Sequence, residues 1–276
     1  MGDAAADLAR TFAANRTVGG IALAVRSHAG VTRRSRVREE GSLRVRCPGP
    51  AAGELEAVLL NTAGGVAGGD RLMLHVTVES RAQLVITTAA AEKVYRTLAP
   101  DATIGVKLDV AAGASLAWLP QETILFDRAR LKRSIDIDLA EDARLVLAEA
   151  IVFGRSGMGE AVDECFLLDR WRLRRRRRLI HAEAMRLDGA VTAKLAQPAV
   201  AKGGIAIATV LAVPGDQGTA AAVRALGPFR GEVGVSAWNG LAVVRLCAAD
   251  GTALRHDLIA VLAAMRAAPL PRLWLN

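Results

Sequence analysis

Hydrophobic and polar residues alternate along most of the chain, and between residues 74 and 150 the alternation recurs as three similar units. Each unit contains an alternating strand, a polar turn and a second, more apolar strand that opens on Ala-x-Leu. The alanines that begin these second strands are Ala82, Ala114 and Ala143, spaced 32 and 29 residues apart. A strand–turn–strand unit repeated at this spacing predicts stacked β-units around one continuous core.

The two strands of each unit differ in their expected environment. The alternating strand has one face for solvent and one for the core, whereas the more apolar strand is expected between two layers. We therefore predict a mainly β fold, a β-sandwich or β-helix-like stack, with about two helices. One helix is expected to begin at Asp216 and run through Leu226, with Asp216 as its N-cap. The other covers residues 252–268 at the C-terminus, where apolar residues recur at helical spacing.

The domain organisation follows from length and pattern. With 276 residues the chain is long enough for one large core, and we predict a single domain over 1–276. Residues 1–20 are Ala-rich and weakly patterned, so they are expected to form a loosely ordered N-terminus.

The composition indicates in which part of the cell the protein is expected. Hydrophobic residues make up 52% of the chain, yet no run approaches the roughly 18 apolar residues that a membrane span needs. The acidic start has no signal-peptide apolar region, so we expect a cytoplasmic protein without membrane contact. Cys47, Cys165 and Cys247 are odd in number and far apart, which is typical of reduced core thiols.

The net charge of +8 makes an acidic partner plausible and raises the question of nucleic acid. Five consecutive arginines, Arg174–Arg178, lie between two predicted strands. A hairpin tip explains them better than nucleic-acid contact, because no aromatic platform or known binding module surrounds the run. A basic nucleic-acid-binding module is kept as an alternative.

The most glycine-rich stretch is the loop Asn61–Asp70, which follows a short apolar run. Its glycines do not fit the dinucleotide fingerprint, and Asp70 stands where a phosphate-binding P-loop needs Lys. Paired glycines predict backbone with positive φ or close approach of another group. A hydrolase with its active site at the Gly64–Asp70 loop is a second alternative, although no catalytic motif with specific spacing occurs in the chain.

Carboxylates recur at the ends of the apolar strands and in glycine-rich turns. Scattered oxygen ligands suit weak, exchangeable handling of a divalent cation, whereas a tight nickel or zinc site would need His or Cys. The competing interpretation makes these groups solvated strand-end residues. They are Asp70, Glu92, Glu122, Glu149 and Glu160.

Several ordered motifs resemble the UreD family of urease accessory proteins, also called UreH. The resemblance is strong over roughly residues 20–186 and looser over 203–276, and the Arg174–Arg178 run departs from the Gly-containing hairpin turn expected there. The motifs are Gly41–Val45, Asn61–Asp70, Thr87–Arg96, Trp118–Glu122, Phe153–Arg155, Met158–Glu160 and Pro271–Trp274.

This resemblance implies a non-catalytic protein that binds the urease apoprotein and assembles with UreF-type and UreG-type accessory proteins. Such an assembly promotes delivery of nickel and carbon dioxide to the urease metallocentre. Family models route nickel through a tunnel in this protein. The resemblance therefore implies no tightly bound cofactor, no nucleic-acid partner, and transient nickel contacts at Asp70, Glu122, Glu149 and Glu160.

Trp274 is singled out by its position. It lies beyond Pro269, which ends the predicted C-terminal helix, and has no place in that helix's apolar stripe. Since aromatic residues are common anchors at interfaces, we expect Trp274 to bind a partner, the UreF-type protein.

Overall fold

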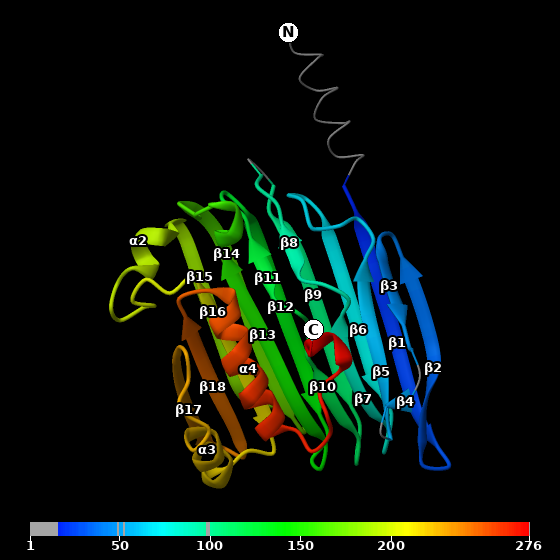
Figure 1. The fold of residues 1–276 in the computed structure, drawn as a ribbon. Coiled ribbons are helices and arrows are strands. Elements are labelled where there is room, and N and C mark those ends of the chain that lie inside the picture. The colour runs from blue at the N-terminus through cyan, green and yellow to red at the C-terminus, as the bar shows by residue number, and fades with distance from the viewer. Residues whose placement is uncertain (1–15, 49, 52, 98–99, 276) are drawn as a thin grey trace, which may run out of the picture.

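Two β-sheets packed face to face form the body of the protein (Figure 1). The computed structural model describes residues 16–275 except 49, 52, 98 and 99. The expectation of a loosely ordered segment over 1–20 falls mostly outside the described residues. Its last part is wrong, because Val18 already begins a strand.

Sheet A has seven strands in the order β15-β14-β12-β9-β6-β1-β2. Its inner strands run parallel, and antiparallel hairpins form its two edges. The strands are β1 (Val18–His28), β2 (Val31–Glu40), β6 (Arg71–Val78), β9 (Ala102–Val110), β12 (Arg130–Leu139), β14 (Glu164–Arg175) and β15 (Arg178–Ala190).

Sheet B has eleven strands, with the main order β17-β18-β16-β13-β10-β7-β5-β3. Beside this path, β4 pairs with β5, and β11 pairs with both β8 and β13. The strands are β3 (Leu43–Arg46), β4 (Pro50–Ala51), β5 (Glu54–Asn61), β7 (Gln83–Thr88), β8 (Glu92–Val94), β10 (Ser115–Trp118), β11 (Thr123–Leu125), β13 (Arg144–Phe153), β16 (Ala206–Val213), β17 (Glu232–Trp238) and β18 (Leu241–Ala248).

The three repeated units are successive turns of a β-solenoid. In each unit the alternating strand lies in sheet A and the apolar strand in sheet B, giving the pairs β6–β7, β9–β10 and β12–β13. Ala82, Ala114 and Ala143 occupy equivalent turns and are all buried. The predicted mainly β, stacked architecture is confirmed.

Helices cover only part of the surface. Helix α4 (Gly251–Met265) and the C-terminal turn η2 (Arg272–Trp274) lie over sheet B (Figure 1). Helix α3 (Gln217–Arg224) packs against β17, with Asp216 as the predicted N-cap. The sequence did not predict the short α2 (Val191–Leu195) or the turn η1 (Ser156–Met158). No helix in the described part of the chain is long and apolar enough to cross a membrane.

The apolar interior has two layers. A large core fills the space between the sheets, and a second cluster lies between sheet B and α4. The second cluster explains why β13 and β16 are apolar on both faces. It also fixes the C-terminus, because the α4 side chains Leu254, Leu258 and Val261 are buried in it.

Trp274 belongs to this second cluster and is buried, which its position outside the helical stripe did not predict. Its side chain is 1% exposed, and its indole N–H donates to the Leu119 carbonyl at 3.0 Å. The Arg255 guanidinium lies 5.1 Å from the ring centroid. Pro269 ends the helix, but the chain then turns back onto sheet B, so Trp274 is buried although it is outside the helical stripe. Its role in partner binding stays a prediction.

The Arg174–Arg178 run forms the tip of the β14–β15 hairpin, as predicted. Arg175 pairs with Arg178, so Arg176 and Arg177 make a two-residue turn. Both have positive φ, 49° and 63°. This is the geometry in which Asn-Gly is favoured and in which other residues are strained.

The burial of Trp274 makes a change there a stability test. Trp274→Ala removes a fully buried indole and leaves a cavity, which typically costs about 3–5 kcal/mol of unfolding free energy. Thermal and denaturant unfolding of the purified chain measure this loss. A melting temperature equal to wild type would contradict the core assignment and return Trp274 to the role of a partner anchor.

The hairpin tip predicts a gain in stability. Replacing Arg176-Arg177 by Asn-Gly relieves the positive-φ strain and should raise the unfolding free energy by about 1 kcal/mol. The change also breaks the ion pair of Arg176 with Glu141, but both side chains are mostly exposed, so this loss is small. The melting temperature should rise by about 2–4 °C. A fall in melting temperature would show that the arginines themselves stabilise the turn.

Candidate functional site between the sheets

A buried cluster of charges lies in the space between the two sheets. Arg133 on β12 and Asp169 on β14 are direct neighbours in sheet A. Two parallel hydrogen bonds join them, from Nε to Oδ1 at 3.0 Å and from Nη2 to Oδ2 at 2.5 Å. Glu149 comes from β13 in the facing sheet and accepts a hydrogen bond from Arg133 Nη1. Each of the three side chains is only 4–6% exposed.

Two indoles complete the hydrogen bonding of the carboxylates. Trp118 Nε1 donates to Glu149 Oε1 at 2.8 Å, and Trp171 Nε1 donates to Asp169 Oδ1 at 3.2 Å. A buried carboxylate is costly without partners, and these contacts supply them. We call Arg133, Glu149, Asp169 and the two tryptophans the buried charge cluster.

Burial and the neighbouring charges have opposite effects on the pKa values of Arg133 and Glu149. Burial raises the pKa of Glu149, although the Arg133 guanidinium beside it acts in the other direction. Burial would lower the pKa of Arg133, but the carboxylates of Asp169 and Glu149 outweigh it and raise that pKa. Arg133 is therefore always cationic, and burial favours the neutral form of Glu149.

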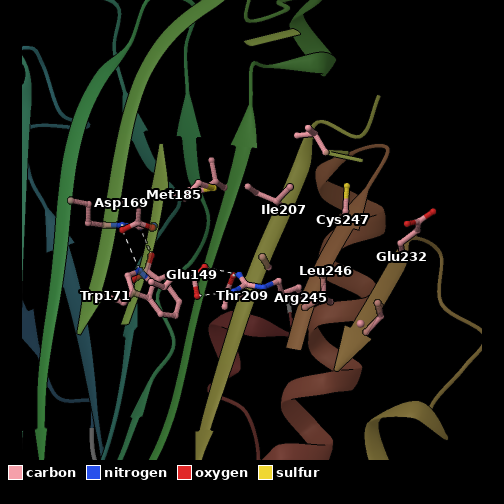
Figure 2. A pocket seen from close by; sticks show the side chains of 17 residues that line it. Glu149, Asp169, Trp171, Met185, Ile207, Thr209, Glu232, Arg245, Leu246 and Cys247 are labelled. Atoms are coloured by element: carbon pink, nitrogen blue, oxygen red, sulfur yellow. Dashed lines mark hydrogen bonds and ion pairs between the residues drawn. The ribbon is translucent and has the colours of Figure 1, made fainter. Parts of the chain in front are cut away.

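A cavity of about 420 Å³ opens on one side of the buried charge cluster. Figure 2 shows its lining, in which side chains of β12, β14 and β15 in sheet A face those of β13, β16, β17 and β18 in sheet B. Besides the cluster, the polar or sulfur-bearing side chains there include Glu183, Met185, Thr209, Glu232, Arg245 and Cys247. We call this space the hairpin-side cavity.

Glu183 is a second carboxylate of the hairpin-side cavity that is held by an arginine. The Arg245 guanidinium donates to its two oxygens at 2.6 and 3.0 Å. Burial alone would raise the pKa of Glu183, but its interactions with His181 and Arg245 lower that pKa to about 2. Glu183 is therefore ionised across the physiological range.

A second cavity of about 360 Å³ lies on the other side of the cluster, and we call it the loop-side cavity. Its lining is mostly apolar and includes Asn61, Gln121 and the loop from Thr88 to Lys93. Asn61 Nδ2 donates to the two Glu92 oxygens at 3.2 and 3.3 Å. Burial raises the pKa of Glu92 to about 7, and the hydrogen bond from Asn61 only partly offsets it.

The two cavities meet at the same pair of side chains. Arg133 and Glu149 line both of them, so the buried charge cluster separates the hairpin-side cavity from the loop-side cavity. Glu149 was expected from the sequence as a cation-contacting residue, and it alone of the four candidates borders both cavities.

The other three candidates lie elsewhere, each with a local partner. Asp70 accepts hydrogen bonds from the backbone N–H groups of Thr17 and Ala67, at 2.8 and 2.7 Å. Glu122 lies 3.4 Å from Arg255, and Glu160 lies 2.7 Å from Arg155. The structure therefore does not bring the four carboxylates together. In the described ranges, no three His, Cys, Asp or Glu side chains are arranged to hold a metal ion.

The Asn61–Asp70 loop owes its glycines to backbone geometry. Gly64 and Gly69 have positive φ, 76° and 90°. A Cβ on Gly65 would lie 2.5 Å from the Tyr95 ring, and one on Gly68 would lie 2.1 Å from Thr97 Oγ1. Asp70 closes the loop by its backbone contacts, so the loop's polar groups are used structurally and not as a nucleophile with its base.

Sequence reasoning missed Arg133 and Asp169. The available signal was a charged residue at an inward position of an alternating strand. Arg133 falls between the buried Leu131 and Ile135, and Asp169 between Leu167 and Trp171. The pattern marks such residues as unusual but does not show which charges meet, because β13 separates β12 from β14 along the chain.

Comparison with known proteins identifies the family. The model of the UreD urease accessory protein family matches residues 17–275. A urease accessory protein UreD of Rhodopseudomonas palustris is 53% identical over 275 residues, which is 99% of both chains. The UreD protein of Bradyrhizobium diazoefficiens is 55% identical over 266 residues, 96% of both chains. A UreD 3 of another Bradyrhizobium is 53% identical over 275 residues, again 99% of both.

These matches cover the whole solenoid, both cavities and the C-terminal helix. They confirm the expectation of a non-catalytic accessory protein in the maturation of the urease nickel centre, in preference to a hydrolase or a nucleic-acid-binding module. The chain belongs to the UreD urease accessory protein family.

Proposed function

We propose that this protein binds the urease apoprotein, assembles with UreF-type and UreG-type accessory proteins, and conducts nickel between its two sheets towards urease. The observation that carries the nickel route is the pair of cavities that meet at Arg133 and Glu149. Nickel is the cargo here, and the protein keeps none of it.

Charge balance supports passage of a cation past the buried charge cluster. Two carboxylates face one guanidinium, so the cluster is net negative when both carboxylates are ionised. A divalent cation arriving beside Glu149 competes with Arg133 for the same oxygen. Oxygen ligands hold nickel less tightly than His or Cys, and transport needs release as well as capture.

Further carboxylates extend the route in both directions. Glu92 borders the loop-side cavity, and Glu183 and Glu232 border the hairpin-side cavity. With Glu149 and Asp169 between them, a cation meets oxygen ligands on both sides of the cluster. Asp70, Glu122 and Glu160 lie outside both cavities and are not part of this route.

The first test removes a charge and keeps the shape. Glu149→Gln should reduce the nickel content of co-expressed urease several-fold, because the buried charge cluster loses its net negative charge. Folding should survive, since Asp169 still holds Arg133 by two hydrogen bonds. Metal analysis of purified urease and recovery of the accessory complex measure the two effects separately.

Glu160→Gln is the matched control, because it breaks a more exposed ion pair away from both cavities. It should leave nickel loading unchanged. Full nickel loading with Glu149→Gln would refute the route, and equal loss of nickel and of the assembled complex would assign Glu149 a structural role only.

The second test obstructs the route by volume. Gly234 on β17 borders the hairpin-side cavity, and a Cβ added there meets no atom within 4 Å. Gly234→Phe should therefore fit without disturbing the fold while filling part of the cavity. Nickel content of urease should fall, and binding of the accessory proteins should persist.

Ser236→Phe provides the control for bulk and exposure. It lies two residues further along the same face of β17 and does not border the cavity. Equal urease nickel content in both variants would mean that nickel does not pass through the hairpin-side cavity.

A further inference from the structure

Within the described part of the chain, the helices α3 and α4 leave the outward face of sheet A uncovered. Helix α4 packs against β16 and β18, and α3 against β17, all in sheet B. The inward residues of β1, β6, β9 and β12 are buried, whereas their outward neighbours are exposed or half-buried. Small residues form much of the floor of this face: Gly20, Ala22, Ala24, Gly105, Ser134, Ala182 and Ala184.

Most of the protein's excess positive charge is on this same face. The strand registers place arginines and lysines at outward positions on all seven strands, and outward carboxylates are far fewer. The cations are Arg26, Arg33, Arg36, Arg38, Arg71, Lys107, Arg130, Lys132, Arg170, Arg172, Arg174 and Arg186. The carboxylates are Glu40, Asp109, Asp136, Asp138 and Asp188. We call this surface the basic face.

Several of these cations have no internal partner. Arg33 and Arg36 on β2, and Arg170 and Arg172 on β14, are exposed and make no ion pair with another described residue. Three further cations surround the Phe166 ring, with Arg130 4.8 Å from its centroid and Lys132 and Arg186 each 5.8 Å away. Arg130 and Lys132 pair with Asp101, and Arg186 pairs with Asp188. The unpaired arginines of β2 and β14 are like charges placed two or three residues apart on one strand, at an electrostatic cost that a partner of opposite charge would relieve.

The basic face is large enough to bind a folded protein partner. Seven strands spaced about 4.8 Å apart span about 29 Å. Eight to ten residues of strand give a similar length, so the face offers roughly 800 Å². This is the area per partner of a standard protein–protein interface. A single bound peptide would cover only part of it.

Other occupants fit less well. A second copy of the chain would bring the same positive charge to the face. A single-stranded nucleic acid would find no exposed aromatic ring for stacking on this face, since Phe166 is buried. Small floor residues with an arginine-rich rim and the exposed Met73 match the composition of protein interfaces.

We infer that the basic face docks an acidic surface of the urease apoprotein. This inference rests on the proposed function, which makes urease a partner. The basic face lies across both sheets from α4 and the C-terminal turn, where the sequence predicts contact with the UreF-type protein. One molecule can then hold urease and the UreF-type protein on opposite faces.

The test measures binding of the full chain to immobilised urease apoprotein at 50 and 500 mM NaCl. One variant carries Arg33→Glu, Arg36→Glu and Arg38→Glu on β2, and a second carries Arg170→Glu and Arg172→Glu on β14. The control carries Arg81→Glu, Arg144→Glu and Arg177→Glu, three exposed arginines outside the basic face. Circular dichroism and melting temperature establish that each chain is folded.

Both face variants should bind urease at least about tenfold more weakly at 50 mM NaCl, with a smaller difference at 500 mM, where charge is screened. The control should bind like wild type. Wild-type affinity and salt dependence in either folded face variant would overturn the inference and leave the proposed function intact. Failure of the wild-type chain to bind urease would overturn both.

A duplex DNA of 20 base pairs serves as the competing probe. If wild-type chain binds the duplex at 150 mM NaCl, and the face variants lose that binding but keep urease, the basic face is a nucleic-acid surface and the inference is wrong. Absence of duplex binding together with weakened urease binding supports it.

Discussion

The pairing of Arg133 with Asp169 and Glu149 is the interaction on which the interior is built. Moving an ion from water into a protein core costs several kcal/mol of free energy. A well-paired buried ion pair is therefore rarely more stabilising than apolar residues of similar size at the same position. The surrounding strands are rich in buried Leu, Ile and Val, so apolar side chains could also have filled this position. Three charges are held there instead, by five hydrogen bonds from guanidinium and indole groups. They keep polar atoms between two cavities that apolar side chains would otherwise close.

The solenoid provides the positional accuracy that such a cluster requires. In-register parallel pairing places Arg133 beside Asp169, and the turn after β12 returns the chain so that Glu149 on β13 faces them. A shift of one residue in either register would turn a charge outward and an apolar residue into its place. The repeated turns with buried Ala82, Ala114 and Ala143 fix that register. The repeated strand–turn–strand units therefore hold the three charged side chains in the register that their hydrogen bonds require.

How far the sequence predicts this structure depends on the range of the interaction. Alternation and turn residues are local, so the stacked units, the capped helix at Asp216 and the arginine hairpin tip were all predictable. Glu149 was found because it follows the apolar run that ends at Ala148, although the strand continues through it to Phe153. Its partners were not, because the meeting of β12 with β14 is set by long-range pairing that no local pattern encodes. The burial of Trp274 was not predicted for the same reason: the helix stop at Pro269 is local, but the return of the chain onto Leu119 is not.

Positive charge lies mainly on the outward face of sheet A, whereas carboxylates border the interior cavities. This separation limits how a cation could enter the protein. The proposed interior route borders several carboxylates, whereas most of the chain's net charge of +8 lies on the outward face of sheet A. A positive surface repels free divalent cations over about 8 Å at physiological salt. A protein that gathered nickel from solution would have the opposite arrangement, with acidic side chains outside. In the proposed route this distribution favours direct transfer of nickel from a docked accessory protein, while the acidic surface of docked urease neutralises the basic face. Docking and conduction are then two consequences of one charge distribution.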